Sequence, residues 1–406
     1  MKKKVISAVL AATMVAGMMG NVVSVSAEEK YDLTLYSINT TDPDFDDWLA
    51  NVEEATGLNI NVVAAPTDTD TRQQKITTIL STGDSSVDVI ESAAFKNSGW
   101  LEGLNDTVMT DDIIDQFAQG YIADMITDKD GNIVGVPGYS GYLAFWVNQE
   151  IMDEVGIESI DTKEDFMKYM EAVSKDGRYG YGGSWEKTYV FNELAQFVNM
   201  FGGDYFDWTK EENKEAVQFL HDLVANNETP IDEIADKYEQ MNPKANDGKY
   251  GCWFMWGLGT DYANADMLGE DKIHMAMVPD FSGNGERAIF TDSWSYVLNS
   301  ASKNKDAAIK FLQYMADEGG MEASYKAFDR YPARKDVAEK VVPDTDPAKE
   351  MYSQYANECN VQGRPMVAQT MEFISDMGTI FQSCMKDEIT VDEFCEKAQE
   401  LVETYQ

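Results

Sequence analysis

The most restrictive feature of this sequence is a regular alternation of strand-like and helix-like segments near its start. β-Branched and apolar residues predict strands at residues 33–37, 59–64 and 87–91. Between them, apolar residues at helical spacing predict helices at residues 42–57 and 71–82, each ending at or next to a glycine. Strands that alternate with helices in this way pair in parallel and are joined by right-handed crossovers. We therefore predict an α/β lobe.

Residues 130–156 indicate a segment that leaves this lobe. An Asp-Gly turn at its start leads into a short apolar run and Pro137, and small and aromatic residues follow at 138–142. A strand that ends at Asn148 and a helix that ends at Gly156 complete the segment. The Gly and Tyr residues after the proline keep the backbone accessible. Such a segment suits a chain that crosses an open cleft better than one that fills a core.

The N-terminus has the pattern of a secretory signal peptide. Three lysines at positions 2–4 precede a short apolar run at 5–20, and small residues follow at 25–27. The alternative is a membrane anchor, but the run is short, rich in small residues and followed by a small-residue exit. We expect cleavage near Ala27 and an exported, extracellular or surface-associated protein. The first cysteine is Cys252, so no lipid-modified cysteine is expected at the cleavage site.

The charge limits the possible partners. The chain has 32 basic and 72 acidic residues, which gives a net charge of −40. Such a charge argues against nucleic acids and anionic membrane surfaces as partners. The acidic residues are spread along the whole chain, so we interpret them as solvated faces and not as a site for cations. The remaining length after the signal peptide is enough for two lobes with substantial cores.

The cysteines do not form a metal-binding pattern, since no CxxC pair exists. An exported chain permits disulfides. Cys384 and Cys395 flank a Lys-Asp-Glu turn between two helix-like segments, and they are the one pair that this spacing suggests. The alternative is that both residues are free thiols. The distance and orientation of the two residues decide between these possibilities, and the sequence does not give them.

Other patterns for metals and catalysis are incomplete. Residues 128–132 resemble the first ligands of a calcium loop, but the glycine is too early and Tyr139 stands where the last carboxylate would be. His221 lies in a predicted helix and His274 in a predicted strand, without the partners of a zinc site or a catalytic triad. Neither G-x-S-x-G nor a Walker loop is present. We expect no metal, no cofactor, no direct ATP binding and no catalytic residues.

Short motifs in a fixed order identify a family. The chain has Thr56-Gly57, Ser81-Thr82-Gly83-Asp84, Val87-Asp88-Val89-Ile90, Phe145-Trp146-Val147-Asn148, Thr162 to Phe166, Ser302 to Met315, and Arg330-Tyr331-Pro332-Ala333-Arg334. Together they resemble the blocks of extracellular solute-binding proteins of ABC importers, the family 1 group that includes maltose-binding protein. Val87 stands where the family usually has proline, and Lys163 where tryptophan is common. Each motif alone is weak, but their order covers nearly the whole chain.

The resemblance implies a two-lobed periplasmic-binding-protein-like fold of type II. Two α/β lobes would be joined by interlobe hinge strands, with a cleft between them. Lobe 1 would take residues 28–137 and 291–331, and lobe 2 residues 138–290 and 332–406. The hinge candidates are residues 138–141 and 290–293.

Aromatic residues on predicted loops indicate the kind of ligand. Flat rings bury the apolar face of a sugar, while Asp, Asn and Arg side chains bind its hydroxyls. Each ring taken alone can equally be a packing residue. The candidate ligand-binding residues are Asn39, Asp44, Ser92, Tyr139, Trp185, Tyr189, Trp256, Asp292, Trp294 and Arg330.

Three functions remain open at this stage. The first is a monomeric binding protein that captures a carbohydrate, most simply an oligosaccharide, by hinge closure and delivers it to the transmembrane subunits of an ABC permease. The second is a binding protein for another solute, such as a polyamine. The third is a secreted glycoside hydrolase, which needs two carboxylates placed across a cleft. The family resemblance favours the first.

Overall fold

The computed structural model describes residues 31–67, 69–92, 95–256, 268–269, 271–344, 346–367 and 369–406. The predicted signal peptide lies outside these ranges, so its cleavage near Ala27 stays a prediction. Within the same ranges, no helix combines the length and the apolar character needed to cross a membrane.

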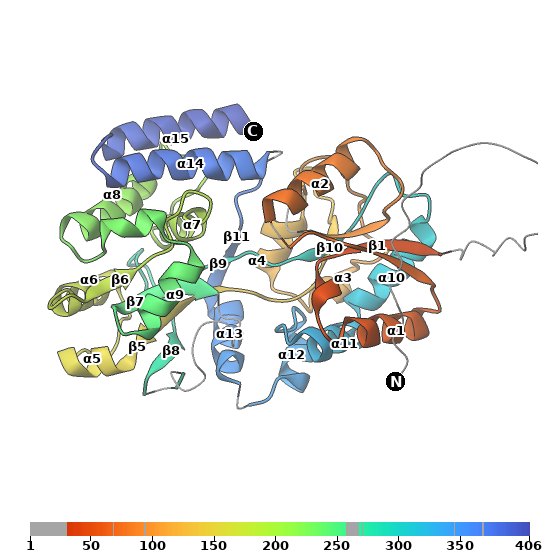
Figure 1. Cartoon of the computed structure of the whole chain (residues 1–406), viewed down its shortest axis with the longest axis horizontal. Helices are drawn as coiled ribbons and strands as arrows, with labels where there is room; N and C mark the ends of the chain where they lie inside the picture. The colour runs from red at the N-terminus through yellow and green to blue at the C-terminus, as the bar shows by residue number, and fades with distance from the viewer. Residues whose placement is uncertain are drawn as a thin grey trace, which may run out of the picture. The chain divides into compact units, whose positions relative to one another are not determined.

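The first lobe is built on a five-stranded sheet of order β2-β1-β3-β10-β4 (Figure 1). Its strands are β1 (Leu33–Ser37), β2 (Ile60–Ala64), β3 (Val89–Ser92), β4 (Gly135–Pro137) and β10 (Ser295–Leu298). β1 runs parallel to β2 and β3, whereas β10 runs antiparallel to β3 and β4. The chain therefore leaves this sheet after β4 and returns to it as β10.

Helices pack on this sheet as the sequence pattern predicts. α1 buries Phe45, Trp48 and Val52, which recur on one helical face, and it ends at Gly57 with a left-handed φ of 64°. The predicted alternation of strands and helices is confirmed. The helices of this lobe are α1 (Phe45–Thr56), α2 (Thr69–Ser81), α3 (Asp111–Ile114), α4 (Gln119–Tyr121), α10 (Lys305–Ala316) and α11 (Glu318–Phe328), with the short 3₁₀-helix η1 (Asn39–Thr41) and the short π-helix η2 (Ile122–Ile126).

The second lobe is built on a four-stranded sheet of order β6-β7-β5-β8. Its strands are β5 (Leu143–Asn148), β6 (Tyr179–Gly182), β7 (Tyr250–Trp256) and β8 (Ile273–Ala276). Its helices are α5 (Gln149–Val155), α6 (Lys163–Val173), α7 (Phe191–Met200), α8 (Glu211–Ala225), α9 (Tyr238–Asn246), α13 (Pro347–Glu358), α14 (Thr370–Met385) and α15 (Val391–Tyr405), with η3 (Ile231–Ala235). Phenylalanine rings from three of its elements pack together in the core, with Phe197 of α7 against both Phe219 of α8 and Phe254 of β7 at 5.6 Å.

Two chain segments that cross between the sheets are hydrogen-bonded to each other. The first connects β4 to β5, and the second connects β9 (Arg287–Thr291) to β10. The Gly141 N–H donates to Ser293 Oγ at 2.8 Å, and Thr291 Oγ1 donates to the Gly141 carbonyl at 2.7 Å. β9 also pairs in parallel with β11 (Cys359–Gly363). The hinge candidates at 138–141 and 290–293 therefore lie side by side, and their role as hinges stays a prediction.

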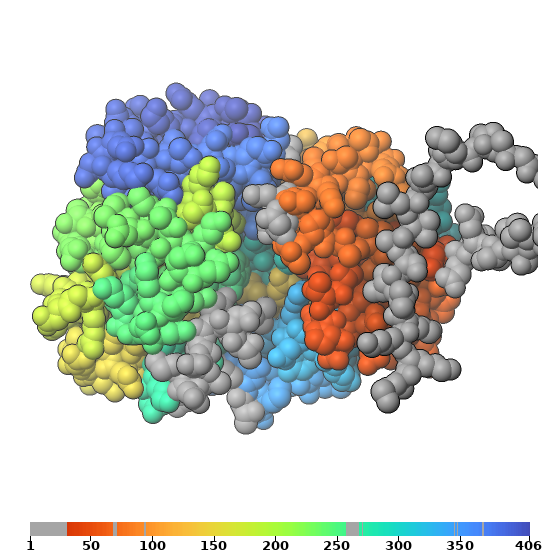
Figure 2. Space-filling model, viewed as in Figure 1, coloured from red at the N-terminus to blue at the C-terminus, as the bar shows by residue number. Residues whose placement is uncertain are grey.

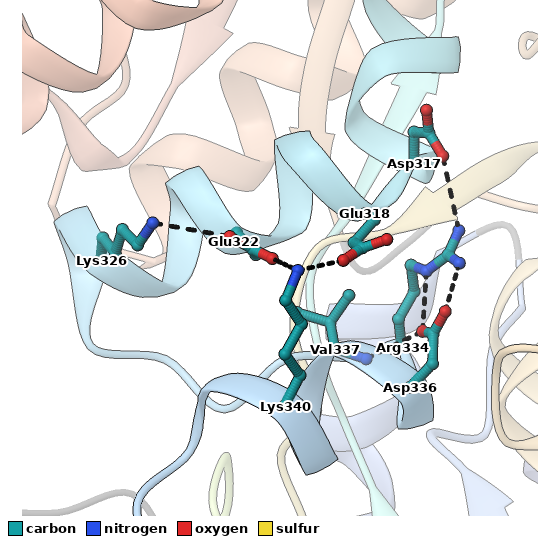
Figure 3. Close-up of polar contacts among 8 residues, drawn as sticks. All are labelled: Asp317, Glu318, Glu322, Lys326, Arg334, Asp336, Val337 and Lys340. Atoms are coloured by element: carbon teal, nitrogen blue, oxygen red, sulfur yellow. Dashed lines mark hydrogen bonds and ion pairs between the residues drawn. The ribbon is translucent and has the colours of Figure 1, made fainter.

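A third connection runs through α12 (Lys335–Val341), and polar contacts hold it against α11 (Figure 3). Lys340 contacts both Glu318 and Glu322, and it lies on the exposed surface. Arg334 is buried; its Nη2 lies 2.6 Å from Asp336 Oδ2, and its Nη1 donates to the Ala316 carbonyl at 2.9 Å. Exposed ion pairs contribute little to stability, so Arg334 is the stronger anchor of this junction.

The residue limits of the two lobes stay a prediction. The packing of the core bears on one of them, the limit at residue 331. The strands of the two sheets divide at the connections after β4 and before β10. Beyond residue 331, however, Ala333, Val337 and Met366 pack in the core of the first lobe. The α12 segment is thus shared between the lobes, and a sharp limit at residue 331 is too simple.

The four cysteines are free thiols in this structure. Cys384 lies in α14 and Cys395 in α15, two helices that pack against each other. Burial raises the pKa of the Cys384 thiol to about 12. The disulfide suggested by the turn between these two residues is not formed.

Candidate binding site

A cleft of about 560 Å³ lies between the lobes, and we call it the central compartment. In Figure 2 the surface is hollowed between the orange part, which contains α2, and the green part, which contains α7 to α9. The crossing segments and the end of β11 supply further side chains. The lining residues are Thr67, Arg72, Gln73, Tyr139, Gly141, Thr188, Tyr189, Phe191, Asn192, Lys237, Tyr238, Glu239, Trp256, Asp292, Trp294, Arg364 and Met371.

A smaller inner compartment of about 20 Å³ adjoins the central one, and the two share Tyr139 and Trp294. Glu91, which is buried, accepts hydrogen bonds there from the Ile38 N–H at 2.7 Å and from Asn39 Nδ2 at 2.9 Å. Burial raises the pKa of Glu91. A volume of this size holds one water-sized group, such as a hydroxyl.

Aromatic rings from both lobes form walls of the central compartment. The Arg72 guanidinium lies 4.7 Å from the ring centroid of Trp294, and the backbone carbonyls of the loop before α2 hold Arg72 in place. On the second lobe, Tyr189 packs edge-on against Tyr238 at 4.8 Å, and Trp256 Nε1 donates to the Tyr238 hydroxyl at 3.1 Å. The rings are therefore oriented by contacts within their own lobes before any ligand arrives.

An ion pair lies at the crossing segments. Arg364 Nη2 contacts Asp292 Oδ2, and both side chains are largely buried, at 12% and 8% exposure. Burial raises the pKa of Asp292, and the Arg364 guanidinium opposes this rise. Asp292 Oδ1 accepts no hydrogen bond from the described residues. Oδ2 of the Asp292 carboxylate is thus engaged by Arg364, whereas Oδ1 can still accept a hydrogen bond.

Buried polar atoms with unused capacity recur along both compartments. Asn39 Oδ1, Gln73 Oε1 and Asn192 Oδ1 also accept no hydrogen bond from the described residues. All three side chains are at least nine-tenths buried. Buried acceptors of this kind are costly unless a donor reaches them. The walls can therefore receive hydroxyl or amino groups of a ligand.

The structure brings most of the predicted site residues together. Tyr139, Tyr189, Trp256, Asp292 and Trp294 line the central compartment, and Asn39 and Arg330 line the inner one. Arg330 lies over the Tyr139 ring at 5.2 Å. Ser92 is buried at the end of β3, opposite Ser295 of β10, and does not line either compartment in the part of the chain that the structure describes. The binding roles of these residues stay predictions.

Two predicted residues do not reach the cleft, and we withdraw them. Asp44 is exposed at the start of α1 and is absent from the lining formed by the described residues. Trp185 is wholly buried in the core of the second lobe. Its ring packs edge-on against Phe381 at 5.5 Å, and its Nε1 donates to Glu193 Oε2 at 2.9 Å. No face of this ring is left to stack on a ligand.

The sequence interpretation missed several lining residues. Arg72 and Gln73 lie in α2, where they look like ordinary polar helix positions. Asn192 and Tyr238 begin helices and give no loop signal. Arg364 follows a strand and precedes a proline, a position at which an irregular loop can carry a site residue. The position of Arg364 between a strand and a proline is therefore the one signal among these residues that points to the site.

The buried carboxyl group of Glu193 makes the free energy of unfolding of this protein depend on pH. It accepts hydrogen bonds from Tyr181 Oη, the Ser184 N–H at 2.7 Å and Trp185 Nε1. Burial raises its pKa from 4.5 to about 7. The folded protein therefore keeps a proton that the unfolded chain loses, and the free energy of unfolding falls as the pH rises from about 4.5 to about 7.

We expect Glu193→Gln to remove a large part of this pH dependence, about 3 kcal/mol across the window. Urea unfolding of the wild-type protein and the variant at several pH values between these limits measures it. The exposed carboxylate of Glu400 on α15 provides the control, since Glu400→Gln should leave the wild-type profile unchanged. A variant profile as steep as that of the wild type would contradict the assignment.

Comparison with known proteins identifies the family of this chain. The model of the bacterial extracellular solute-binding protein family matches residues 39–322. An arabinooligosaccharide-binding protein of Halalkalibacterium halodurans is 26% identical over 390 residues, which cover 86% of this chain and 84% of that protein. The chain belongs to the bacterial extracellular solute-binding protein family.

Solved structures show the same two-lobed fold. Maltose-bound MalE3 of T. maritima superposes with a TM-score of 0.69 at 18% identity, covering 92% of this chain and 99% of that one. The sugar-binding protein MalE of Xanthomonas citri gives a TM-score of 0.74 at 14% identity, covering 92% and 97%. The predicted α/β two-lobed fold and the predicted family are thus confirmed.

Proposed function

We propose that this protein is the carbohydrate-binding component of an ABC importer. The observation that supports this most directly is the central compartment, which combines aromatic walls from both lobes with buried polar atoms that have unused hydrogen-bonding capacity. Rings bury the apolar faces of sugar units, and amides and charged groups bind their hydroxyls. The relative from H. halodurans is named as an arabinooligosaccharide-binding protein, so arabino-oligosaccharides are the first ligands to test for this protein.

The proposed mechanism is hinge closure. Trp294 and Arg72 belong to the first lobe, and Tyr189 and Trp256 to the second. A ligand that contacts both walls binds the closed arrangement more tightly than the open one, so it shifts the population toward closure. The permease would then recognise the closed form. The protein would act as an exported monomer without catalytic turnover.

The charge of the lining argues against a polyamine as ligand. Arg72, Lys237 and Arg364 line the central compartment, against the carboxylates of Asp292 and Glu239. Asp292 is already paired with Arg364. A polycation would meet more positive than negative side chains there, although the chain as a whole is strongly acidic.

The same two carboxylates bear on the hydrolase alternative. A glycoside hydrolase needs one carboxylic acid and one carboxylate facing each other across the sugar. Asp292 is engaged by Arg364, while Glu239 is exposed in the first turn of α9. This arrangement favours binding without cleavage.

Calorimetry against a panel of arabino-oligosaccharides, malto-oligosaccharides and polyamines tests the proposal. We expect binding of at least one of the sugar series and no heat with spermidine. Tight spermidine binding without a response to any sugar would refute the carbohydrate assignment. Chromatography of the sugars after long incubation tests turnover, and released monosaccharide would show a hydrolase instead.

A further inference from the structure

The side chain of Arg364 reaches the central compartment, but its backbone is held by residues outside the cleft. The Gly363 N–H donates to Asp124 Oδ2 at 3.1 Å, and the Arg364 N–H donates to Met125 Sδ at 3.3 Å. Neither Asp124 nor Met125 is among the described residues that line the central or the inner compartment. The end of β11, which carries a lining residue, is therefore fixed by side chains of the first lobe that do not line the cleft.

β11 packs closely on α4 and η2, which follow each other in the chain (Figure 1). A Cβ atom at Gly120 of α4 would overlap the Val361 carbonyl, and one at Gly363 would overlap the Met125 thioether. Glycine at these two positions lets the backbones approach each other. η2 is a π-helix, a rare form that is frequent at functional sites. Because the backbones are in contact, the position of η2 sets the position of the end of β11.

Asp124 is in turn held by Lys96, which follows β3 in the chain. Lys96 Nζ donates to the Asp124 carbonyl, and both side chains are partly buried. Burial raises the pKa of Asp124, and the Gly363 N–H and the Lys96 ammonium oppose this rise. Burial lowers the pKa of Lys96, and the carboxylates of Asp124 and Asp128 oppose this fall. Lys96 and Asp124 therefore stabilise each other's charged form, and a charged carboxylate is the stronger acceptor for the Gly363 N–H.

The position of the β11 end matters because the Arg364 guanidinium has partners on different elements. Its Nη2 contacts Asp292 Oδ2 on a crossing segment, and the group lies 4.9 Å from the centroid of the Phe191 ring of α7. Its Nε is buried and has no acceptor among the described residues. A planar guanidinium needs defined geometry for such contacts, and residues behind a binding group supply it by fixing its backbone.

We propose that Asp124 is a positioning residue for Arg364. Its hydrogen bond to the Gly363 N–H holds the end of β11 so that the guanidinium is oriented for a ligand before binding, and Lys96 keeps Asp124 in place. Pre-orientation lowers the entropy cost of binding. This inference rests on the proposed carbohydrate function and assigns a role in binding to residues that do not line the cleft. Asp124 affects affinity only through Arg364.

Calorimetry with arabinotriose and maltotriose tests the proposal. For the sugar that binds, Asp124→Ala should weaken binding about tenfold, because the Gly363 N–H loses its acceptor and the strand end is released. Asp124→Asn keeps an oxygen acceptor and should stay within about threefold of the wild type. Lys96→Met removes the support of Asp124 and should weaken binding about threefold.

The control is the other carboxylate beside Lys96. Asp128 accepts hydrogen bonds from the backbone of its own turn, from Asp130 and Asn132. Asp128→Asn therefore removes the same charge as Asp124→Asn without touching β11, and it should leave the affinity unchanged. Equal losses in Asp124→Asn and Asp124→Ala, or wild-type affinity in Asp124→Ala, would overturn the proposal.

A second background separates positioning from a general loss of stability. The double variant Arg364→Met/Asp292→Asn removes the guanidinium without leaving an unpaired buried charge. If Asp124 acts through Arg364, adding Asp124→Ala or Lys96→Met to this background should change Kd by less than about twofold. The same loss of affinity in this background as in the wild type would overturn the positioning role.

Thermal melting of the unliganded protein gives a readout that needs no sugar. Arg364→Met should lower the melting temperature less in the Asp124→Ala chain than in the wild type, because a displaced guanidinium has already lost part of its pairing with Asp292. Equal losses in the two chains would overturn the positioning role. If this difference is found but no sugar binds, the carbohydrate function fails and the positioning of Arg364 by Asp124 stands.

Discussion

Replacing Trp294 with alanine is expected to weaken carbohydrate binding by about 2 kcal/mol or more, roughly 30-fold in Kd. Trp294 lines both the inner and the central compartment, and its ring is held by Arg72 at 4.7 Å. A pre-oriented indole buries a sugar face with little loss of conformational entropy. The unliganded protein should lose the cation–π contact, which is worth about 1 kcal/mol at a partly exposed site.

Calorimetry and thermal melting of the unliganded protein together check this result. Trp256→Ala tests the opposite wall in the same way, with a larger loss of stability because Trp256 also packs on Phe290 at 6.0 Å. Trp100 is a partly exposed tryptophan of the first lobe outside the lining, so Trp100→Ala is the control and should not change affinity. A large drop in melting temperature with unaltered affinity would show that Trp294 is a packing residue.

The Arg364→Met variant should lose about 3 kcal/mol or more of folding free energy at neutral pH. The substitution leaves the Asp292 carboxylate buried without its partner and removes the contact of Arg364 with the Phe191 ring at 4.9 Å. Breaking a buried pair on one side is costly because the remaining charge is not compensated. The exposed pair Lys210–Asp204, at 3.7 Å, gives the contrast, since Lys210→Met should cost less than about 1 kcal/mol.

The pH dependence of the Arg364→Met variant identifies the cause of its loss. Burial already raises the pKa of Asp292, and removal of the guanidinium raises it further. A carboxyl with a raised pKa favours folding while it is protonated, and this contribution is lost as the pH rises through that pKa. The deficit should therefore grow with pH, and Asp292→Asn in the same chain should recover most of it. A deficit that is independent of pH and unchanged in the double variant would contradict this account.

How much of the site could be predicted depends on the kind of signal each residue carries. Tyr139, Asp292 and Trp294 lie on the segments that cross between the lobes, and these segments were recognisable from turns and the family motifs. Arg72 and Gln73 were not, because a polar residue in a helix looks the same whether it faces water or a cleft. Trp185 and Trp294 both follow strands in the sequence, yet one is wholly buried and the other lines two compartments.

Local patterns were sufficient for the strands and helices of the first lobe. Apolar spacing and the glycine at position 57 act within a few residues, so the sequence alone specified β1, α1 and β2. The partners of the cleft were decided only by tertiary structure. Arg364 meets Asp292 because β11 pairs with β9 across a long stretch of chain, and the central compartment forms because residues of α2 line the same cleft as residues of α7 and α9. Such contacts depend on how distant elements pack, and no local pattern contains that information.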